Sequence, residues 1–186
     1  MNSKFYFLFF VFFVATALAG FYFFDKNPHL KEAQVAVGEG FKKFVHPTIG
    51  FSLEYPENLV VNQFNEKENA KSVVFQKSTD DSSLSTEEKT GFQIYALPFD
   101  DEGKGLTLEK IKHDLPNVAI EEPVEAFIGE KAGEPKKAWI FWIQNPKIGR
   151  TREVWFVDKG YLFEVTTYAH LDLWLAQIMS TWSCCG

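Results

Sequence analysis

The segment FDDEGKG at residues 99–105 comes closest, in residue types, to a metal site. Asp100, Asp101 and Glu102 offer carboxylate oxygens, which are the ligands that calcium prefers. The three acids are consecutive, however, and the segment lacks the alternating ligand spacing and the closing glutamate of an EF-hand loop. We therefore interpret it as a solvated loop, keep these three residues only as weak calcium candidates, and predict no cofactor.

A second candidate is the stretch HPTIGFSLEYPENLVV, which begins at His46 and brings Ser52 and Glu54 close together in sequence. No glycine stands two positions after Ser52, so the stretch is not a nucleophile elbow. Ser52 also alternates with Phe51 and Leu53, which is the period of a β-strand. The four histidines of the chain are dispersed and show no metal-ligand spacing. We predict a structural role for the stretch and no catalytic residue.

Two further pairs of residues have chemistry to offer. Arg150 and Arg152 are the only arginines of the chain, and paired guanidinium groups can hold a carboxylate or a phosphate. At the entrance of a strand, solvated charges are the interpretation we favour. Cys184 and Cys185 are adjacent and match neither a disulfide framework nor a CxxC motif. A vicinal disulfide, an intermolecular disulfide and two free thiols all stay open for them.

The composition indicates a folded protein that does not bind nucleic acid. Hydrophobic residues make up 46% of the chain and aromatic residues 17%, as in globular domains. The formal net charge is −6. An acidic chain of this kind lacks the basic footprint that recognises a phosphate backbone.

The amino-terminal residues 5–24, FYFLFFVFFVATALAGFYFF, carry no charged side chain. A helix of about 20 apolar residues spans the hydrocarbon core of a bilayer. The sequence therefore predicts one transmembrane helix that acts as an uncleaved signal anchor. The alternative is a signal peptide cut after Ala19, but the apolar run continues through Phe24, and aromatic residues suit the membrane boundary.

The rest of the chain alternates short apolar runs with turn signals. Residues 25–43 are polar and are predicted to form a tether, and residues 78–90 a polar loop. One helix is expected over 106–115, with Thr107 as its N-cap, and another over 171–182, with an apolar stripe. The predicted strands cover residues 50–55, 72–77, 92–98, 124–128, 137–144, 152–157 and 161–168.

The late strands predict how the elements are layered. Residues 139–143 and 154–157 are apolar at every position, whereas a sheet with one wet face would alternate. Such strands need cover on both sides. We therefore expect an α+β fold in which one antiparallel-rich sheet lies between helical layers, preceded by the transmembrane helix.

These patterns resemble a known family. An aromatic residue at Phe44 followed by GFSLEYPENL, the hairpin VWFVDKGYLFEVTTYA and the final helix LWLAQIMSTW are similar to the PsbP-like family over about residues 44–183. That family includes the photosystem II extrinsic protein PsbP and, more distantly, the Ran-binding Mog proteins. The resemblance implies an α/β/α sandwich that serves as an accessory or binding domain.

Together these observations predict a signal anchor (1–24), a tether (25–43) and one PsbP-like domain (44–186). We expect a single-pass membrane protein whose domain lies outside the cytoplasm, in the periplasm or at the cell surface. The predicted function is that of a non-catalytic accessory or binding protein, with a possible protein partner in an envelope complex. An enzyme with a spatially assembled site, and a small-ligand carrier, are the alternatives.

Overall fold

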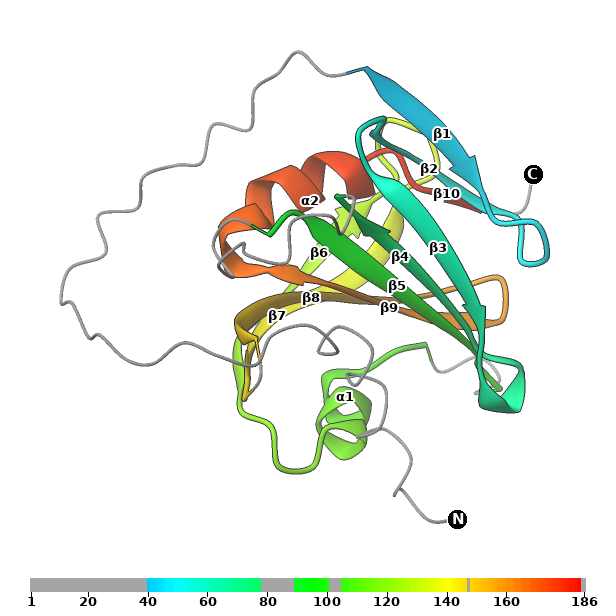
Figure 1. The fold of residues 1–186 in the computed structure, drawn as a ribbon. Helices are drawn as coiled ribbons and strands as arrows, with labels where there is room; N and C mark the ends of the chain where they lie inside the picture. Colours follow the sequence, from blue (N-terminus) through cyan, green and yellow to red (C-terminus); the bar gives the residue numbers. More distant parts are fainter. Residues whose placement is uncertain (1–39, 78–88, 101–104, 147, 185–186) are drawn as a thin grey trace, which may run out of the picture.

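The computed structural model describes residues 40–77, 89–100, 105–146 and 148–184. Within these ranges the chain is mostly β-structure and forms two antiparallel sheets and two α-helices (Figure 1). The larger sheet has the strand order β3 (Val60–Asn65), β4 (Lys71–Gln76), β5 (Gly91–Pro98), β9 (Tyr161–Tyr168), β8 (Gly149–Asp158), β7 (Lys136–Asn145) and β6 (Ile120–Ile128).

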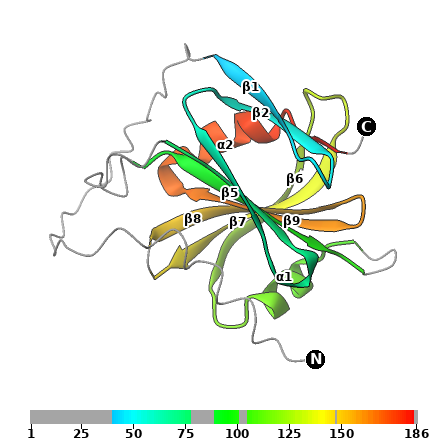
Figure 2. The same cartoon turned by 45° about the vertical axis from the view of Figure 1, so that its right-hand side comes forward.

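The smaller sheet has the order β1 (Phe41–Val45), β2 (Phe51–Pro56) and β10 (Ser183–Cys184). It lies together with helix α2 (Asp172–Met179) over one face of the larger sheet, and helix α1 (Leu108–Asp114) lies against the other face (Figures 1 and 2). Short 3-10 turns at Lys67–Asn69 and Ala169–Leu171 complete the described elements. The larger sheet is therefore the middle layer.

The main core lies on the α2 face of the larger sheet and is rich in aromatic rings. Trp182 is fully buried and stacks on Phe51 of β2, with ring centroids 4.8 Å apart and planes 12° apart. Its ring also meets Phe163 of β9 edge-on at 4.7 Å. The Trp182 indole N–H donates to Oδ2 of the buried Asp158 at 3.2 Å. The end of the chain therefore joins both sheets in one core.

A second core lies on the opposite face, under α1. Ile111 of α1 is fully buried against Phe141 of β7 and Trp155 of β8. The helix begins where the sequence predicts, because the Thr107 hydroxyl accepts the Lys110 N–H at 3.2 Å as an N-cap. This arrangement accounts for the strands that are apolar on both sides: alternate residues of β7 and β8 belong to the two cores.

The hairpin between β8 and β9 has a tight turn. Asp158 pairs with Tyr161, so only Lys159 and Gly160 form the loop. Their φ angles are +46° and +79°, the left-handed values that a two-residue type I′ turn requires at both positions. The I′ turn matches the twist of the two long strands that it joins.

The expected sandwich of one sheet between two helical layers is wrong. The described chain is mostly β-structure with two antiparallel sheets, and β1, β2 and β10 supply much of the cover that was assigned to helices. The error has a physical reason. A strand that is apolar on both faces indicates that both faces are covered, but a second sheet buries such a face as well as a helix does.

Two predictions concern the amino-terminal part. The predicted transmembrane helix, residues 5–24, lies outside the described residues, and among those that are described no helix is long and apolar enough to cross a membrane. The described residues therefore give the predicted membrane anchor no support. The predicted tether 25–43 is also too long, because β1 begins at Phe41. Two exposed lysines in β1 had masked its strand pattern.

Candidate functional site

The predicted calcium loop is only partly described. Asp100 is exposed, and Asp101 and Glu102 lie outside the described residues. Among the described residues, no group of three His, Cys, Asp or Glu side chains is placed to hold a metal ion. The loop therefore gains no support as a metal site from the structure, and the polar loop 78–90 is described only at Lys89 and Thr90.

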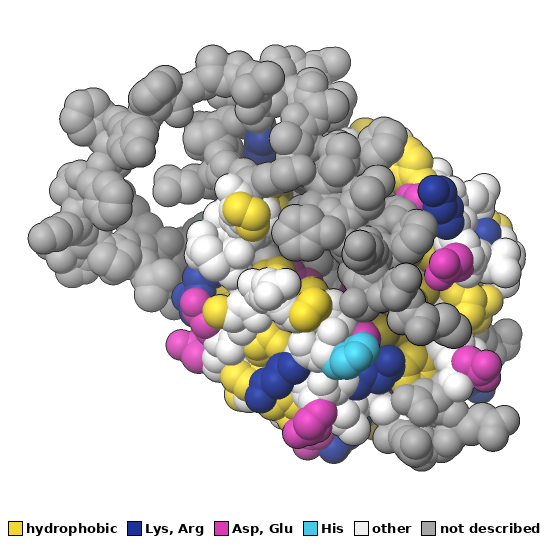
Figure 3. Space-filling view, turned by 90° about the horizontal axis from the view of Figure 1, so that it is seen from below, with side chains coloured by type: hydrophobic (Ala, Val, Ile, Leu, Met, Phe, Trp, Pro, Cys, Tyr) yellow, Lys and Arg dark blue, Asp and Glu magenta, His cyan; other side chains and the backbone are white. Residues whose placement is uncertain are grey.

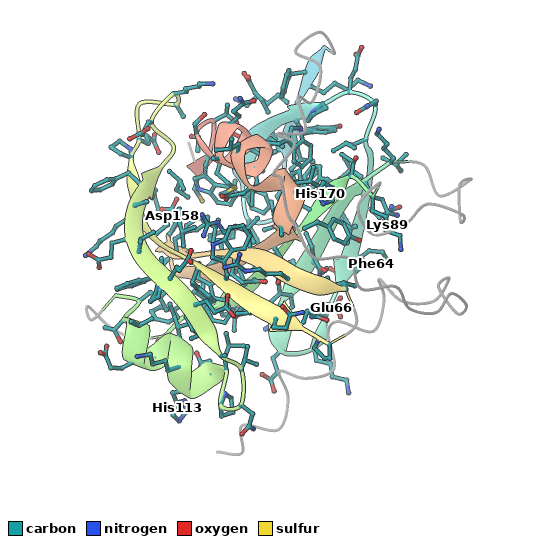
Figure 4. All side chains as sticks on the ribbon, turned by 90° about the vertical axis from the view of Figure 1, so that its left-hand side faces the viewer. Phe64, Glu66, Lys89, His113, Asp158 and His170 are labelled. Carbon is teal, nitrogen blue, oxygen red and sulfur yellow. The ribbon has the colours of Figure 1, made fainter. Side chains whose placement is uncertain are left out.

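The three described histidines are held by separate contacts. His46 is 4% exposed, and its Nδ1 accepts the backbone N–H groups of Thr48 and Ile49 at 3.2 and 3.1 Å. His170 lies beside Lys89, whose carbonyl is 3.0 Å from its Nε2, whereas His113 lies far away on α1 (Figure 4). The structure does not bring these histidines together. His46 shapes the turn between β1 and β2.

The sequence suggested solvated charges for the two arginines, and the structure overturns this only for Arg152, whose side chain is 16% exposed, whereas Arg150 stays exposed. Both guanidinium groups lie over the ring of Trp142, 4.5 Å from its centroid for Arg150 and 4.0 Å for Arg152. Arg152 also donates two hydrogen bonds to Asp172 at the start of α2, and Arg150 pairs with Glu121 at 3.0 Å. Arg152 therefore connects the larger sheet to α2, whereas the contacts of Arg150 stay within the sheet.

A disulfide-bonded cysteine and a small pocket also belong to the described structure. Cys184 is disulfide-bonded, which excludes a free thiol at this position, one of the possibilities that the sequence left open.

A pocket of about 20 Å³ opens between β5, β9 and Ile148, with Gly91, Phe92 and Thr167 in its lining. This volume has room for about one water molecule. This pocket is therefore too small for an organic ligand.

The candidate site is an acidic group on the α1 face of the larger sheet. Glu153 of β8 is 3% exposed and accepts three hydrogen bonds. Thr166 Oγ1 donates at 2.6 Å, Thr151 Oγ1 at 2.8 Å and Trp155 Nε1 at 3.4 Å. Burial raises the pKa of Glu153 to about 7, although these three hydrogen bonds lower it. A carboxyl group that titrates near neutrality therefore lies inside the sheet face.

A second carboxyl group lies beside the first. Glu164 of β9 is half-buried and stands between Trp155 of β8 and Tyr95 of β5 in the strand register. It makes no hydrogen bond or ion pair within the described part of the chain. Burial, followed by the charges of Glu153 and Asp114, raises its pKa to about 8.

The β8–β9 hairpin determines this arrangement. Glu153 pairs with Thr166 and Trp155 pairs with Glu164, so the two acids are diagonal neighbours on one face. The nearby Asp114 is already bound by Lys110 at 3.5 Å and by the His113 ring at 3.3 Å. The described part of the α1 face shows hydrophobic side chains among scattered acidic and basic ones (Figure 3).

Sequence reasoning missed these two glutamates because they are far apart in the chain and match no motif. A signal was nevertheless present, since each acid interrupts a long apolar strand, and the two strands were predicted to form one hairpin. Chemically, two carboxyl groups without a cation can bind a positive group, or can donate and accept a proton near neutral pH.

Comparisons with known proteins add no relative. No family model matches the chain, and a search of curated proteins finds none that matches it. The resemblance to the PsbP-like family therefore stays a prediction.

Proposed function

We propose that the domain is a non-catalytic binding module that recognises a cationic group of its partner, an amine or a guanidinium, at Glu164. The observation that carries this proposal is a half-buried carboxyl group that makes no ion pair within the described residues and stands beside a second acid. Two neighbouring carboxyl groups disfavour each other's ionisation, and a cation relieves that cost.

The surroundings of Glu164 suit a cation. Trp155 and Tyr95 flank it across the two neighbouring strands, and aromatic faces attract ammonium and guanidinium groups. At pH 7 a carboxyl group with a pKa of about 8 is mostly protonated. A bound cation stabilises the charged form, so binding at that pH is expected to release a proton from Glu164.

Proton release gives a direct test. Titration calorimetry of the full chain with a short lysine- or arginine-containing peptide, in two buffers of different ionisation enthalpy, is expected to report up to one proton released at pH 7. Glu164→Gln is expected to abolish both binding and proton release, whereas Glu130→Gln, at an exposed acid, is expected to leave both unchanged. Equal binding by Glu164→Gln would refute the proposal.

A second candidate function is an acid–base enzyme, the alternative that the sequence left open. The raised pKa values of Glu153 and Glu164, about 7 and about 8, favour it, because a general acid works best with a pKa near the working pH. Mass spectrometry of the bound molecule separates the two candidates. A binding module returns its ligand unchanged, whereas an enzyme converts it in a reaction that Glu164→Gln slows.

We also propose that the domain works outside the cytoplasm, as an accessory in an envelope complex. Support comes from the disulfide at Cys184, because such bonds persist mainly in oxidising compartments. Alkylation of intact cells with a thiol reagent, before and after reduction, tests the location. The reagent must reach the cytoplasm of these cells. Labelling of Cys184 without reductant would then show a free thiol and contradict the extracytoplasmic location.

A further inference from the structure

Two end strands of the sheets carry opposite charges. Within the described residues, β6 pairs only with β7 at one end of the larger sheet, and β1 pairs only with β2 at one end of the smaller sheet. An end strand presents backbone N–H and C=O groups that can pair with another strand. The side chains of each edge strand determine which kind of strand it accepts.

The β6 edge is open along only half of its length. Its register shifts between Glu121 and Val124, Glu122 has a φ of +49°, and Pro123 has no N–H to donate. Residues 124–128, in contrast, pair regularly with β7. This regular half carries two exposed apolar side chains, Val124 at 50% and Phe127 at 62%.

Every charged side chain of β6 is acidic, namely Glu121, Glu122 and Glu125. The cations that meet them, Arg150 and Lys137, come from the inner strands β8 and β7. A strand that pairs with the outer edge of β6 therefore lies next to the carboxylates of β6, and the two basic side chains lie further inside the sheet.

The β1 edge has the complementary character. Its five residues pair with β2 without a register shift, and their charged side chains, Lys42 and Lys43, are both basic. Phe41 and Val45 at its two ends are 55% and 56% exposed. The strand FKKFV therefore exposes apolar and basic side chains at every position except the buried Phe44.

We propose that β1 of one copy of this chain adds antiparallel to residues 124–128 of β6 in a second copy. One register of the two strands pairs opposite charges and also pairs the exposed aromatic side chains. With Lys43 opposite Glu125, Phe41 falls opposite Phe127, and the two pairs share one face because side chains alternate. An ion pair and an aromatic pair across neighbouring strands are both stabilising.

Charge determines which edges pair. Two β1 strands would oppose lysine with lysine, and two β6 strands would oppose glutamate with glutamate, which is destabilising. The remaining long edge, β3, has the sequence VVNQFN and carries no charge that could select a partner. The β1–β6 contact joins two different surfaces, so it continues head to tail from copy to copy. Two five-residue strands bury little area, so the association is weak and depends on concentration.

Cysteine cross-linking of the full chain tests the register. Lys43→Cys and Glu125→Cys variants, mixed under mild oxidation, are expected to give a disulfide-linked dimer whose bridge joins positions 43 and 125 by peptide mass spectrometry. The control mixes Lys43→Cys with Gln63→Cys, at an exposed position of the β3 edge. A control yield equal to that of the test pair, or no dimer in either mixture, would overturn the proposal.

Charge reversal provides an independent readout in solution. In sedimentation velocity over rising concentration, Lys43→Glu alone and Glu125→Lys alone are expected to lower the weight-average mass, because each opposes like charges. The double variant restores opposite charges and is expected to regain the association. Circular dichroism spectra that match those of the original chain confirm that the variants fold. A double variant no more associated than the single ones would overturn the proposal.

Discussion

The guanidinium group of Arg152 donates two hydrogen bonds to the carboxylate of Asp172, from Nε to Oδ1 at 2.6 Å and from Nη2 to Oδ2 at 3.0 Å. Arg152 belongs to β8, and Asp172 is the first residue of α2. The carboxylate also stabilises the helix start, since negative charge is favourable at a helix N-terminus. This contact therefore joins the helix to the sheet at the point where the chain enters α2.

We expect Asp172→Ala to lower the free energy of unfolding by about 2 kcal/mol, because it removes a two-point charged hydrogen bond that is partly shielded from water. Arg150→Ala is the matched control on the same strand. Its ion pair is more exposed, so a loss below about 1 kcal/mol is expected. Urea unfolding measures both losses. If the two variants lose equal free energies of unfolding, the two hydrogen bonds between Arg152 and Asp172 contribute no more than a surface ion pair.

Local patterns predicted the elements that depend on local physics. The expected strand over 161–168 coincides with β9, and the expected helix over 106–115 contains α1 at Leu108–Asp114. In both cases the determining features lie within a few residues: apolar side chains along the strand, and the hydroxyl of Thr107 at the helix start.

Contacts between distant segments were beyond such patterns. The strand β10 has two residues and exists because Ser183 and Cys184 pair with β2, more than a hundred residues earlier. The Glu153–Glu164 site likewise depends on the register of the β8–β9 turn. Nothing in either strand alone indicates that the two carboxyl groups meet on one face.

The two raised glutamate pKa values predict how stability changes with pH. A carboxyl group whose pKa is higher in the folded than in the unfolded state binds more protons when folded, so it stabilises the fold at low pH. For Glu153 and Glu164 this contribution is complete below about pH 4.5 and is lost as the pH rises towards 7 and 8. We expect Glu164→Gln to flatten the decline of stability between pH 5 and pH 8. Urea unfolding across that range measures it, and an unchanged slope would contradict a raised pKa at Glu164.

His46 is expected to have the opposite pH dependence. Burial, together with the charge of Lys71, lowers its pKa, so the folded state favours the neutral ring. Its stabilising contribution is present above the unfolded pKa of about 6.5 and is lost as the pH falls through the lower folded value. His46→Ala leaves the N–H groups of Thr48 and Ile49 without their acceptor and should cost about 1–3 kcal/mol at pH 8. His46→Asn, which retains an acceptor, is expected to cost less. A loss as large for Asn as for Ala would exclude the role of acceptor.

Trp174 separates packing from hydrogen bonding in the main core. Its ring is 7% exposed and meets Phe92 edge-on at 5.7 Å. Its indole N–H is buried and has no hydrogen-bond partner among the described residues. Trp174→Ala should cost about 3–5 kcal/mol through lost packing. Trp174→Phe retains most of the ring and removes the unpaired donor, so a cost below about 1.5 kcal/mol is expected. A loss below about 1 kcal/mol for the alanine variant in urea unfolding would show that α2 is undocked.

Two glycines in the turn after β6 have nearly the same backbone conformation but different surroundings. Gly129 has a φ of +75° and Gly133 a φ of +78°. A Cβ atom at Gly129 would lie 2.6 Å from the carbonyl oxygen of Glu134 and 2.8 Å from that of Trp182, whereas at Gly133 nothing lies within 4 Å. Alanine at Gly133 adds only left-handed strain, of about 1 kcal/mol. Alanine at Gly129 adds the same strain and also forces two backbone segments apart, so we expect a loss of about 3 kcal/mol. Thermal unfolding of the two variants isolates the steric part, because the conformational part is common to both. Equal losses would mean that the turn and the end of the chain are not packed together at Gly129.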